Sequence, residues 1–191
     1  MIGRTQMKEE TTKIYTVKDI EALPEGKRAE LIDGRMYEMA SPGRIHQRLL
    51  TAMVRVIANY IEDGDGSCEV YAAPFAVYIN NDEYNYVEPD IVVICSEDRL
   101  DEKGCHGAPD WAIEIVSPGS VKMDRKIKLF KYRTAGVREY WIVDPGERTV
   151  DVYLFAGNEE KTYTFQETVP VGIYEDFAID FSAFLKFFKT S

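Results

Sequence analysis

Two acidic residues stand alone in apolar, strand-forming segments. Asp90 follows Pro89 in "VEPDIVVIC" (87–95), and Glu114 lies in "DWAIEIVSPGS" (110–120). Runs of this kind are typical of strands buried on both faces of a sheet, where an unpaired carboxylate is costly. If the two strands are neighbours, repulsion between the carboxylates favours a cation between them, and hard oxygen ligands suit Mg²⁺ or Mn²⁺. We therefore predict that Asp90 and Glu114 bind a divalent metal. Taken singly, each acid fits equally well as an edge residue in a salt bridge.

The strongest local charge lies between residues 121 and 138. This segment has seven basic residues and one acid, a net charge of +6, in a chain whose net charge is −10. The overall negative charge speaks against a protein that coats nucleic acid. A single basic element on an acidic body can still guide a polyanion to one place, although a solvated helix face is the simpler interpretation. The basic residues are Lys122, Arg125, Lys126, Lys128, Lys131, Arg133 and Arg138.

The chain has 191 residues and no repeat or linker, so we expect one domain over residues 1–191. No apolar run approaches the roughly 20 residues of a membrane span, and residues 1–15 lack the apolar core of a secretory leader. The cysteines Cys68, Cys95 and Cys105 are scattered and odd in number, which suggests neither a disulfide framework nor a zinc site. These features predict a cytoplasmic protein without a membrane anchor.

Periodicity and turn residues locate the elements that must position these side chains. "TVKD" (16–19) opens a short helix that Pro24 ends, and Asp33-Gly34 suits a hairpin turn. Apolar residues recur at helical spacing over 44–63, and a basic helix is expected over 120–135, ended by Gly136. Strands are expected over 69–79, 87–95, 110–116 and 138–144, followed by a meander over 149–155 and 161–166.

The order of these elements predicts an α/β fold. A mixed sheet would be flanked by helices, with a crossover through the basic helix and β-hairpins extending the fold at both ends. The tail "FSAFLKFF" is expected to dock as a helix through Phe181, Phe184, Leu185 and Phe188.

The motifs around the two acids resemble a known family. Pro89-Asp90 and Glu114 resemble the PD-(D/E)xK nuclease signature, whose core has the same element order. Together with "RAELIDGRMYEM" (28–39) and "GVREYWIVDP" (136–145), they resemble the Uma-type family of putative restriction endonucleases over about residues 15–155. The resemblance implies a restriction-endonuclease-like fold and a Mg²⁺- or Mn²⁺-dependent endonuclease that hydrolyses DNA.

The resemblance also implies roles for single residues. Val116 stands where the wider superfamily has a lysine, and in the Uma-type family a lysine on the following helix is thought to replace it. Lys128 matches that lysine and is implied to be catalytic, with Asp124 and Tyr132 as supporting residues on the same stripe. Its alternative role is a helix-surface ion pair with Asp124.

Two further positions match the family pattern. Glu30 matches a glutamate before the hairpin, which implies a catalytic residue and a third metal ligand. Otherwise it is a strand-end acid beside Lys27 or Arg28. His46 matches a histidine and is implied to support the site, although a histidine on an apolar helix face is more often a core residue.

The remaining basic residues are candidates for contact with the DNA backbone. Residues 126 and 128 project about 200° apart on a helix, so only one of them can serve the metal site. We expect Lys128 to do so and Lys126 to touch phosphates. The predicted phosphate contacts are Lys122, Arg125, Lys126 and Arg133.

Two other functions stay open at this point. One is a non-catalytic module that binds a protein or nucleic acid on a nuclease fold, and the other is a metal hydrolase with a smaller phosphorylated substrate. A homodimer is also expected, because both DNA strands must be cut and because Phe187 lies off the docking stripe of the tail.

Overall fold

A computed structural model describes residues 13–64 and 66–188. The prediction that the chain lacks a secretory leader concerns mostly residues 1–12, which lie outside the described ranges. Within those ranges, no helix has the length and apolar character needed to cross a membrane.

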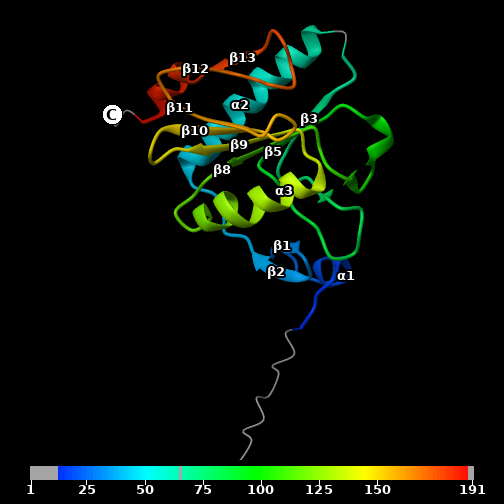
Figure 1. The fold of residues 1–191 in the computed structure, drawn as a ribbon. Helices are drawn as coiled ribbons and strands as arrows, with labels where there is room; N and C mark the ends of the chain where they lie inside the picture. The colour runs from blue at the N-terminus through cyan, green and yellow to red at the C-terminus, as the bar shows by residue number, and fades with distance from the viewer. Residues whose placement is uncertain (1–12, 65, 189–191) are drawn as a thin grey trace, which may run out of the picture.

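A six-stranded mixed sheet forms the centre of the fold (Figure 1). Its order is β11-β10-β9-β8-β5-β3, and every neighbouring pair is antiparallel except β8 and β9. The parallel pair needs a crossover, and the expected basic helix provides it. The strands are β3 (Glu69–Ala72), β5 (Ile91–Ile94), β8 (Trp111–Ile115), β9 (Glu139–Asp144), β10 (Thr149–Leu154) and β11 (Glu159–Thr164).

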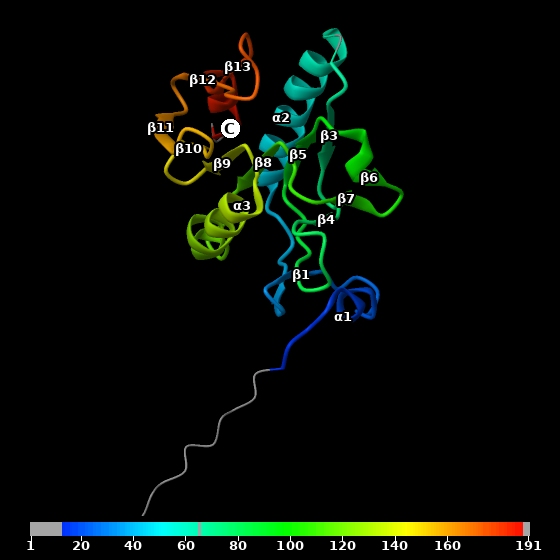
Figure 2. The ribbon, with the colours of Figure 1, turned by 45° about the vertical axis from the view of Figure 1, so that its right-hand side comes forward.

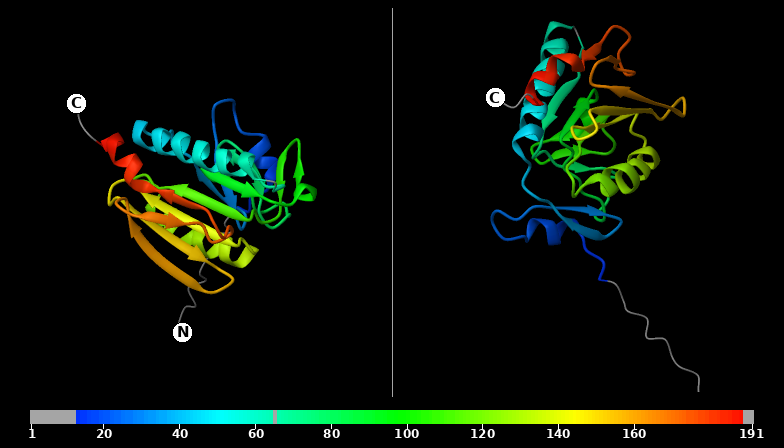
Figure 3. Two further views of the ribbon diagram at one scale, coloured as in Figure 1. Left: turned by 90° about the horizontal axis from the view of Figure 1, so that it is seen from above. Right: turned by 90° about the vertical axis from the view of Figure 1, so that its left-hand side faces the viewer.

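Helices cover opposite faces of this sheet (Figure 3). The helix α2 (Arg44–Asp63) packs its apolar stripe on the face formed by Trp111, Ile113 and Ile115. The crossover packs on the other face, which carries Ala112 and Val116. It consists of a π-helix (Met123–Lys128) that continues into α3 (Leu129–Ala135). Gly136 ends α3 at φ 94°, a left-handed conformation that favours glycine.

The N-terminal hairpin lies beside the main sheet. Strands β1 (Ala29–Ile32) and β2 (Arg35–Glu38) form a separate sheet, with Asp33 at φ 50° and Gly34 at φ 73° in the turn, as the Asp-Gly pair predicts. The short helix α1 (Val17–Glu21) precedes it and begins with the expected capping box. The hairpin thus extends the fold without adding strands to the six-stranded sheet.

A further small sheet interrupts the strand expected over 69–79. The Ala73-Pro74 peptide is cis, and the chain then enters β4 (Val77–Tyr78), which pairs with β7 (Gly104–His106). The third strand is β6 (Leu100–Asp101), preceded by a 3₁₀ turn (Glu97–Arg99). Figure 2 shows these strands on the side of the molecule opposite to β10 and β11.

The tail differs from the expected helix. After β12 (Thr168–Pro170) and β13 (Ala178–Asp180), residues Phe181–Phe188 form a 3₁₀ helix. Because this helix has three residues per turn, its buried side chains are Phe181, Phe184 and Phe187. Leu185 and Phe188 are only partly buried. The prediction that Phe187 is exposed and supports a dimer was therefore wrong.

The cysteine expectation was also wrong in part. Cys68 and Cys95 form a disulfide, while Cys105 is free and buried. The two cysteines flank β3 and β5, and the Glu69–Ile94 pair of this ladder places them opposite each other. Their separation of 27 residues does not reveal the pairing, because it depends on which strands are neighbours.

The buried position of Phe187 makes a prediction about stability. We expect Phe187→Ala to lower the free energy of unfolding by about 3 kcal/mol in denaturant titration, since it removes a ring from the core. The matched control is Phe130→Ala, because Phe130 is 66% exposed and its loss should change stability little. Equal stabilities of the two variants would contradict this packing.

Candidate active site

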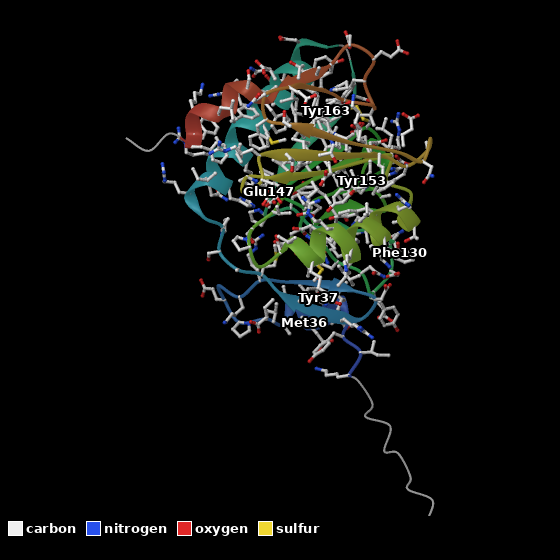
Figure 4. The ribbon with its side chains drawn as sticks, turned by 60° about the vertical axis from the view of Figure 1, so that its left-hand side comes forward. Met36, Tyr37, Phe130, Glu147, Tyr153 and Tyr163 are labelled. Carbon is white, nitrogen blue, oxygen red and sulfur yellow. A yellow bond between two sulfur atoms is a disulfide. The ribbon has the colours of Figure 1, made fainter. Side chains whose placement is uncertain are left out.

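A cavity of about 400 Å³ opens between the N-terminal hairpin, the first turns of α2 and the start of the π-helix. Tyr37 of β2 lines it, and Figure 4 shows this residue on the hairpin beneath α3. Six of the predicted site residues also line it: Glu30, His46, Asp90, Glu114, Asp124 and Lys128. Residues expected from separate parts of the sequence therefore meet in one place.

Asp90, directly before β5, and Glu114 of the neighbouring strand β8 face this cavity. Strands β5 and β8 are antiparallel, and Ile91 pairs with Ile113, so Asp90 lies directly opposite Glu114. Glu114 is on the face of β8 away from Trp111 and Ile113, toward the crossover. The expectation that the two strands are neighbours and their acids share a cavity is confirmed.

Asp90 is held by two neighbours. Its Oδ2 accepts a hydrogen bond from the backbone N–H of Ile115 at 2.8 Å and lies 3.0 Å from His46 Nε2. Because a carboxylate only accepts hydrogen bonds, Nε2 carries the proton in this contact. The other ring nitrogen of His46, Nδ1, is buried without a partner in the described part of the chain. His46 thus lies at the cavity and orients Asp90.

The ammonium group of Lys128 lies at the centre of the acidic residues. Its Nζ is 2.8 Å from Glu30 Oε1, 2.9 Å from Glu114 Oε1 and 3.9 Å from Asp124 Oδ1. The side chain is about 5% exposed, so this is no surface ion pair. Lys128 ends the π-helix, a rare conformation that is frequent at functional sites.

Burial and crowding of like charges set the protonation of this cluster. Burial, with a smaller effect from neighbouring carboxylates, holds the pKa of Glu114 well above its ordinary value of 4.5 although Lys128 opposes this. The pKa of Asp124 is raised for the same reasons. Lys128 stays protonated, because the surrounding carboxylates outweigh the effect of its burial on its pKa. One ammonium does not neutralise the carboxylates, so the cluster favours a further proton or cation.

Tyr132 completes the contacts of Glu114. Its hydroxyl donates to Glu114 Oε1 at 2.9 Å. Burial and the adjacent Glu114 hold the pKa of Tyr132 well above its ordinary value, so the hydroxyl remains a donor. The stripe of Asp124, Lys128 and Tyr132 therefore faces inward, and all three residues are buried.

The other predicted basic residues separate into two groups. Arg125 does not face the cavity; it pairs with Asp144 and Asp151 on β9 and β10 and fastens the crossover to the sheet. Lys122, Lys126 and Arg133 are exposed and form no ion pair with a described residue. Lys126 is thus excluded from the cavity, as its angular position predicts.

Two charged residues at the cavity were missed in the sequence. Arg28 and Glu88 line it and pair with each other, with Arg28 Nε 2.8 Å from Glu88 Oε2. This pairing leaves Glu30 free to contact Lys128 and to accept the backbone N–H of Glu88 at 2.9 Å. The position of Glu88, two residues before Asp90, could have indicated in the sequence that Glu88 lies at the same site.

The donor atoms fit a small divalent cation. The hydrogen bonds above use one oxygen of each acid and leave Asp90 Oδ1 and Glu114 Oε2 for another partner. Mg²⁺ is commonly bound by one or two carboxylates, completed by water and substrate phosphate. Among the described residues, no group of three or more His, Cys, Asp or Glu side chains is arranged around a metal position. Glu30 instead contacts Lys128, and its direct binding of a metal stays a prediction.

The central position of Lys128 predicts a stability effect. Lys128→Met should lower the free energy of unfolding by about 3–5 kcal/mol, because it leaves buried carboxylates without a counter-charge. Mn²⁺ should then raise the thermal midpoint of this variant more than that of the unmodified protein, since a cation replaces the lost charge. Lys126→Met is the control and should be nearly neutral. Unchanged stability of Lys128→Met would show that the cluster does not need its ammonium.

The raised pKa of Glu114 predicts a dependence of stability on pH. The folded state binds a proton at Glu114 that the unfolded state releases, so this residue costs stability as pH rises above about 4.5. Glu114→Gln keeps an acceptor for Lys128 and Tyr132 without the charge. Its thermal midpoint should exceed that of the unmodified protein at about pH 8, and the difference should narrow toward acid pH. Glu159→Gln, at an exposed acid of β11, should show no such trend. A difference that is constant with pH would contradict the raised pKa.

Comparisons with known proteins agree with the motifs. No curated protein matches the chain. Among solved structures, the chain is similar to a crystal structure of a putative nuclease belonging to DUF820 from Anabaena variabilis, with a TM-score of 0.73 and 22% identity over 90% of this chain and 98% of that chain. At this identity the likeness establishes the fold, and the predicted fold class is confirmed. The model of the Uma2 family, described as "Putative restriction endonuclease", matches residues 17–182. Because this match spans most of the chain, the chain belongs to the Uma2 family.

Proposed function

We propose that this protein is a divalent-metal-dependent endonuclease that hydrolyses phosphodiester bonds in DNA. The observation that carries the proposal is the pair Asp90 and Glu114, opposite each other on neighbouring strands, with Lys128 Nζ 2.9 Å from Glu114 in the same cavity. Family membership supports a nuclease, and the acidic cavity supports dependence on a cation.

Asp90 and Glu114 would hold Mg²⁺ or Mn²⁺ through the oxygens that their hydrogen bonds leave open. When bound, such an ion supplies charge stabilisation at the phosphoryl oxygens and lowers the pKa of a water. Its charge would also oppose the effect of burial, and the smaller effect of neighbouring carboxylates, that raise the pKa of Glu114.

Lys128 would stabilise the negative charge that develops on the phosphoryl group. Its ammonium has three N–H groups, and the short contacts to Glu30 and Glu114 use two of them. The third is left for a phosphate oxygen. Glu30 then keeps Lys128 in place, and His46 keeps Asp90 in place through the 3.0 Å contact to Nε2. Hydrolysis adds water across one P–O bond and leaves a phosphate monoester and a hydroxyl, and the proton released by the water ends on the leaving oxygen.

Lys122, Lys126 and Arg133 would contact phosphates outside the cavity. The exposed positions of all three support this assignment. Arg125, by contrast, pairs with Asp144 and Asp151, so it is no longer proposed as a contact to the DNA backbone.

Two further proposals concern the protein as a whole. The proposal of a homodimer now rests only on the need to cut two DNA strands, because Phe187 is buried. A cytoplasmic location rests on the sequence, and the Cys68–Cys95 disulfide weighs against it because disulfides are rare in reducing compartments.

The metal site can be tested with a single substitution. Asp90→Asn should weaken Mn²⁺ binding in calorimetric titration by at least about 100-fold, because loss of even outer-shell partners costs 10–100-fold in metal affinity. The same variant should lose cleavage of plasmid and oligonucleotide DNA. Asp98→Asn, at an exposed acid outside the cavity, is the matched control and should behave as the unmodified protein.

Two results would count against the proposal. Identical isotherms for Asp90→Asn and the unmodified protein would remove the metal from this cavity. Failure of the unmodified protein to cleave DNA with any divalent metal would favour a non-catalytic binding module on the same fold.

A further inference from the structure

The outer face of the crossover carries an exposed aromatic residue in the described part of the chain. Phe130 of α3 is 66% exposed, although a Phe side chain normally gains by burial. Figure 4 labels it on α3 at the edge of the molecule. It does not belong to the cavity, whose residues Asp124, Lys128 and Tyr132 lie on the inward face of the same helical segment. Neither the core nor the active site accounts for Phe130.

The basic residues on the stripe of Phe130 are those that form no ion pair with a described residue, although the Arg133 guanidinium lies over the Phe155 ring. Of the seven basic residues between 121 and 138, ion pairs within the described chain occupy four: Arg125, Lys128, Lys131 and Arg138. The other three are Lys122, Lys126 and Arg133, all exposed. Lys122, Lys126 and Phe130 follow one another at intervals of four residues, and Arg133 follows Phe130 by three. Such spacings place all four on one side of a helix.

This stripe begins next to residues that line the cavity. Gly119, Ser120 and Met123 line the cavity, and Lys122 is an exposed residue between them. Lys122 and Phe130 are eight residues apart, about two turns of this helical segment. A strand whose phosphate lies in the cavity can therefore continue over Lys122 and Lys126 and reach Phe130.

We propose that Lys122, Lys126, Phe130 and Arg133 form a binding surface for an unpaired stretch of the nucleic-acid substrate, with one base stacked on Phe130. The proposal rests on the nuclease function above and assigns that site a preference for unpaired strands. The chemistry is that of known single-strand binders, in which cationic side chains follow the backbone and aromatic rings stack on bases of any sequence. In an intact duplex the flat face of each base is covered by its neighbours, so the ring gains little there.

The charges select this partner over an apolar protein segment. Three cations that form no ion pair with a described residue lie on the same stripe as the ring, and this combination matches a polyanion with aromatic bases. The exposed aromatic Tyr84 provides a contrast, because it lies beside the acidic residues Asp82 and Glu83. Phe130 and Tyr84 are therefore both exposed, but basic residues lie near Phe130 and acidic residues lie near Tyr84.

The test measures binding without cleavage. Fluorescence anisotropy in EDTA would follow a fluorescein-labelled single-stranded oligonucleotide and, separately, the duplex of the same sequence. Phe130→Ala should weaken single-strand binding about 10-fold, which corresponds to about 1.4 kcal/mol, and should leave duplex binding nearly unchanged. Phe130→Trp should restore single-strand binding, because it keeps a stacking ring. Lys126→Gln should lower the salt slope of single-strand binding by about 0.7, as expected for one lost phosphate contact.

The control and the contrary outcomes separate the alternatives. Tyr84→Ala should bind both substrates as the unmodified protein does. Equal binding by Phe130→Ala and the unmodified protein, or an equal loss for both substrates, would overturn the proposal. The proposal would also be overturned if sedimentation velocity showed a dimer of the unmodified protein and a monomer of Phe130→Ala. The ring would then contact a second copy of the chain. Cleavage by the unmodified protein is measured separately with Mn²⁺, so a failure of the nuclease function is distinguishable from a failure of this surface.

Discussion

The active-site region depends on one buried ammonium group. Lys128 joins Glu30 of the N-terminal hairpin to Glu114 of the central sheet, and it approaches Asp124 one helical turn away. Buried carboxylates without a counter-charge are strongly unfavourable, so these three elements can meet only around a cation. The position of the hairpin against the crossover is therefore an electrostatic consequence as much as a packing one.

The sheet also holds the π-helix that carries this ammonium group. Arg125 pairs with Asp144 and Asp151, and the Tyr140 hydroxyl donates to the backbone oxygen of Asp124 at 3.1 Å. The π-helix is thus fixed to β9 and β10, while Lys128 reaches Glu114 of β8 at the cavity. Preorganised sites of this kind lose stability to the burial of charge and to like-charge repulsion, and gain a position where a cation and a phosphate would be favoured. The raised pKa of Glu114 is the sign of that compromise.

Local sequence rules predicted what depends on near neighbours. The helix Arg44–Asp63, the Asp33-Gly34 turn and the stop at Gly136 follow from periodicity and backbone preference. The prediction that Asp90 and Glu114 face one cavity was possible because a lone acid in an apolar strand is stable only beside a cavity or a cation. The predictions that were wrong concern partners distant in sequence. The ion pairs of Arg125 and the disulfide between Cys68 and Cys95 depend on the order of the strands in the sheet, which no local sequence pattern contains. The tail failed for another reason, since its closely spaced apolar residues suit a 3₁₀ helix as well as an α-helix.

The charge count of the basic segment shows how far such patterns mislead. Its +6 suggested a surface for a polyanion, yet most of its basic groups neutralise acids of the same chain. Only three of its exposed cations form no ion pair with a described residue, and a nucleic-acid backbone would be repelled by a protein of net charge −10. Electrostatic attraction alone is a weak source of affinity under these conditions. A cation between Asp90 and Glu114 would reduce the repulsion at the cavity, and a ring that stacks on a base would add affinity that does not depend on charge. An acidic nuclease of this construction would therefore bind its substrate at a few defined contacts instead of along an extended basic groove.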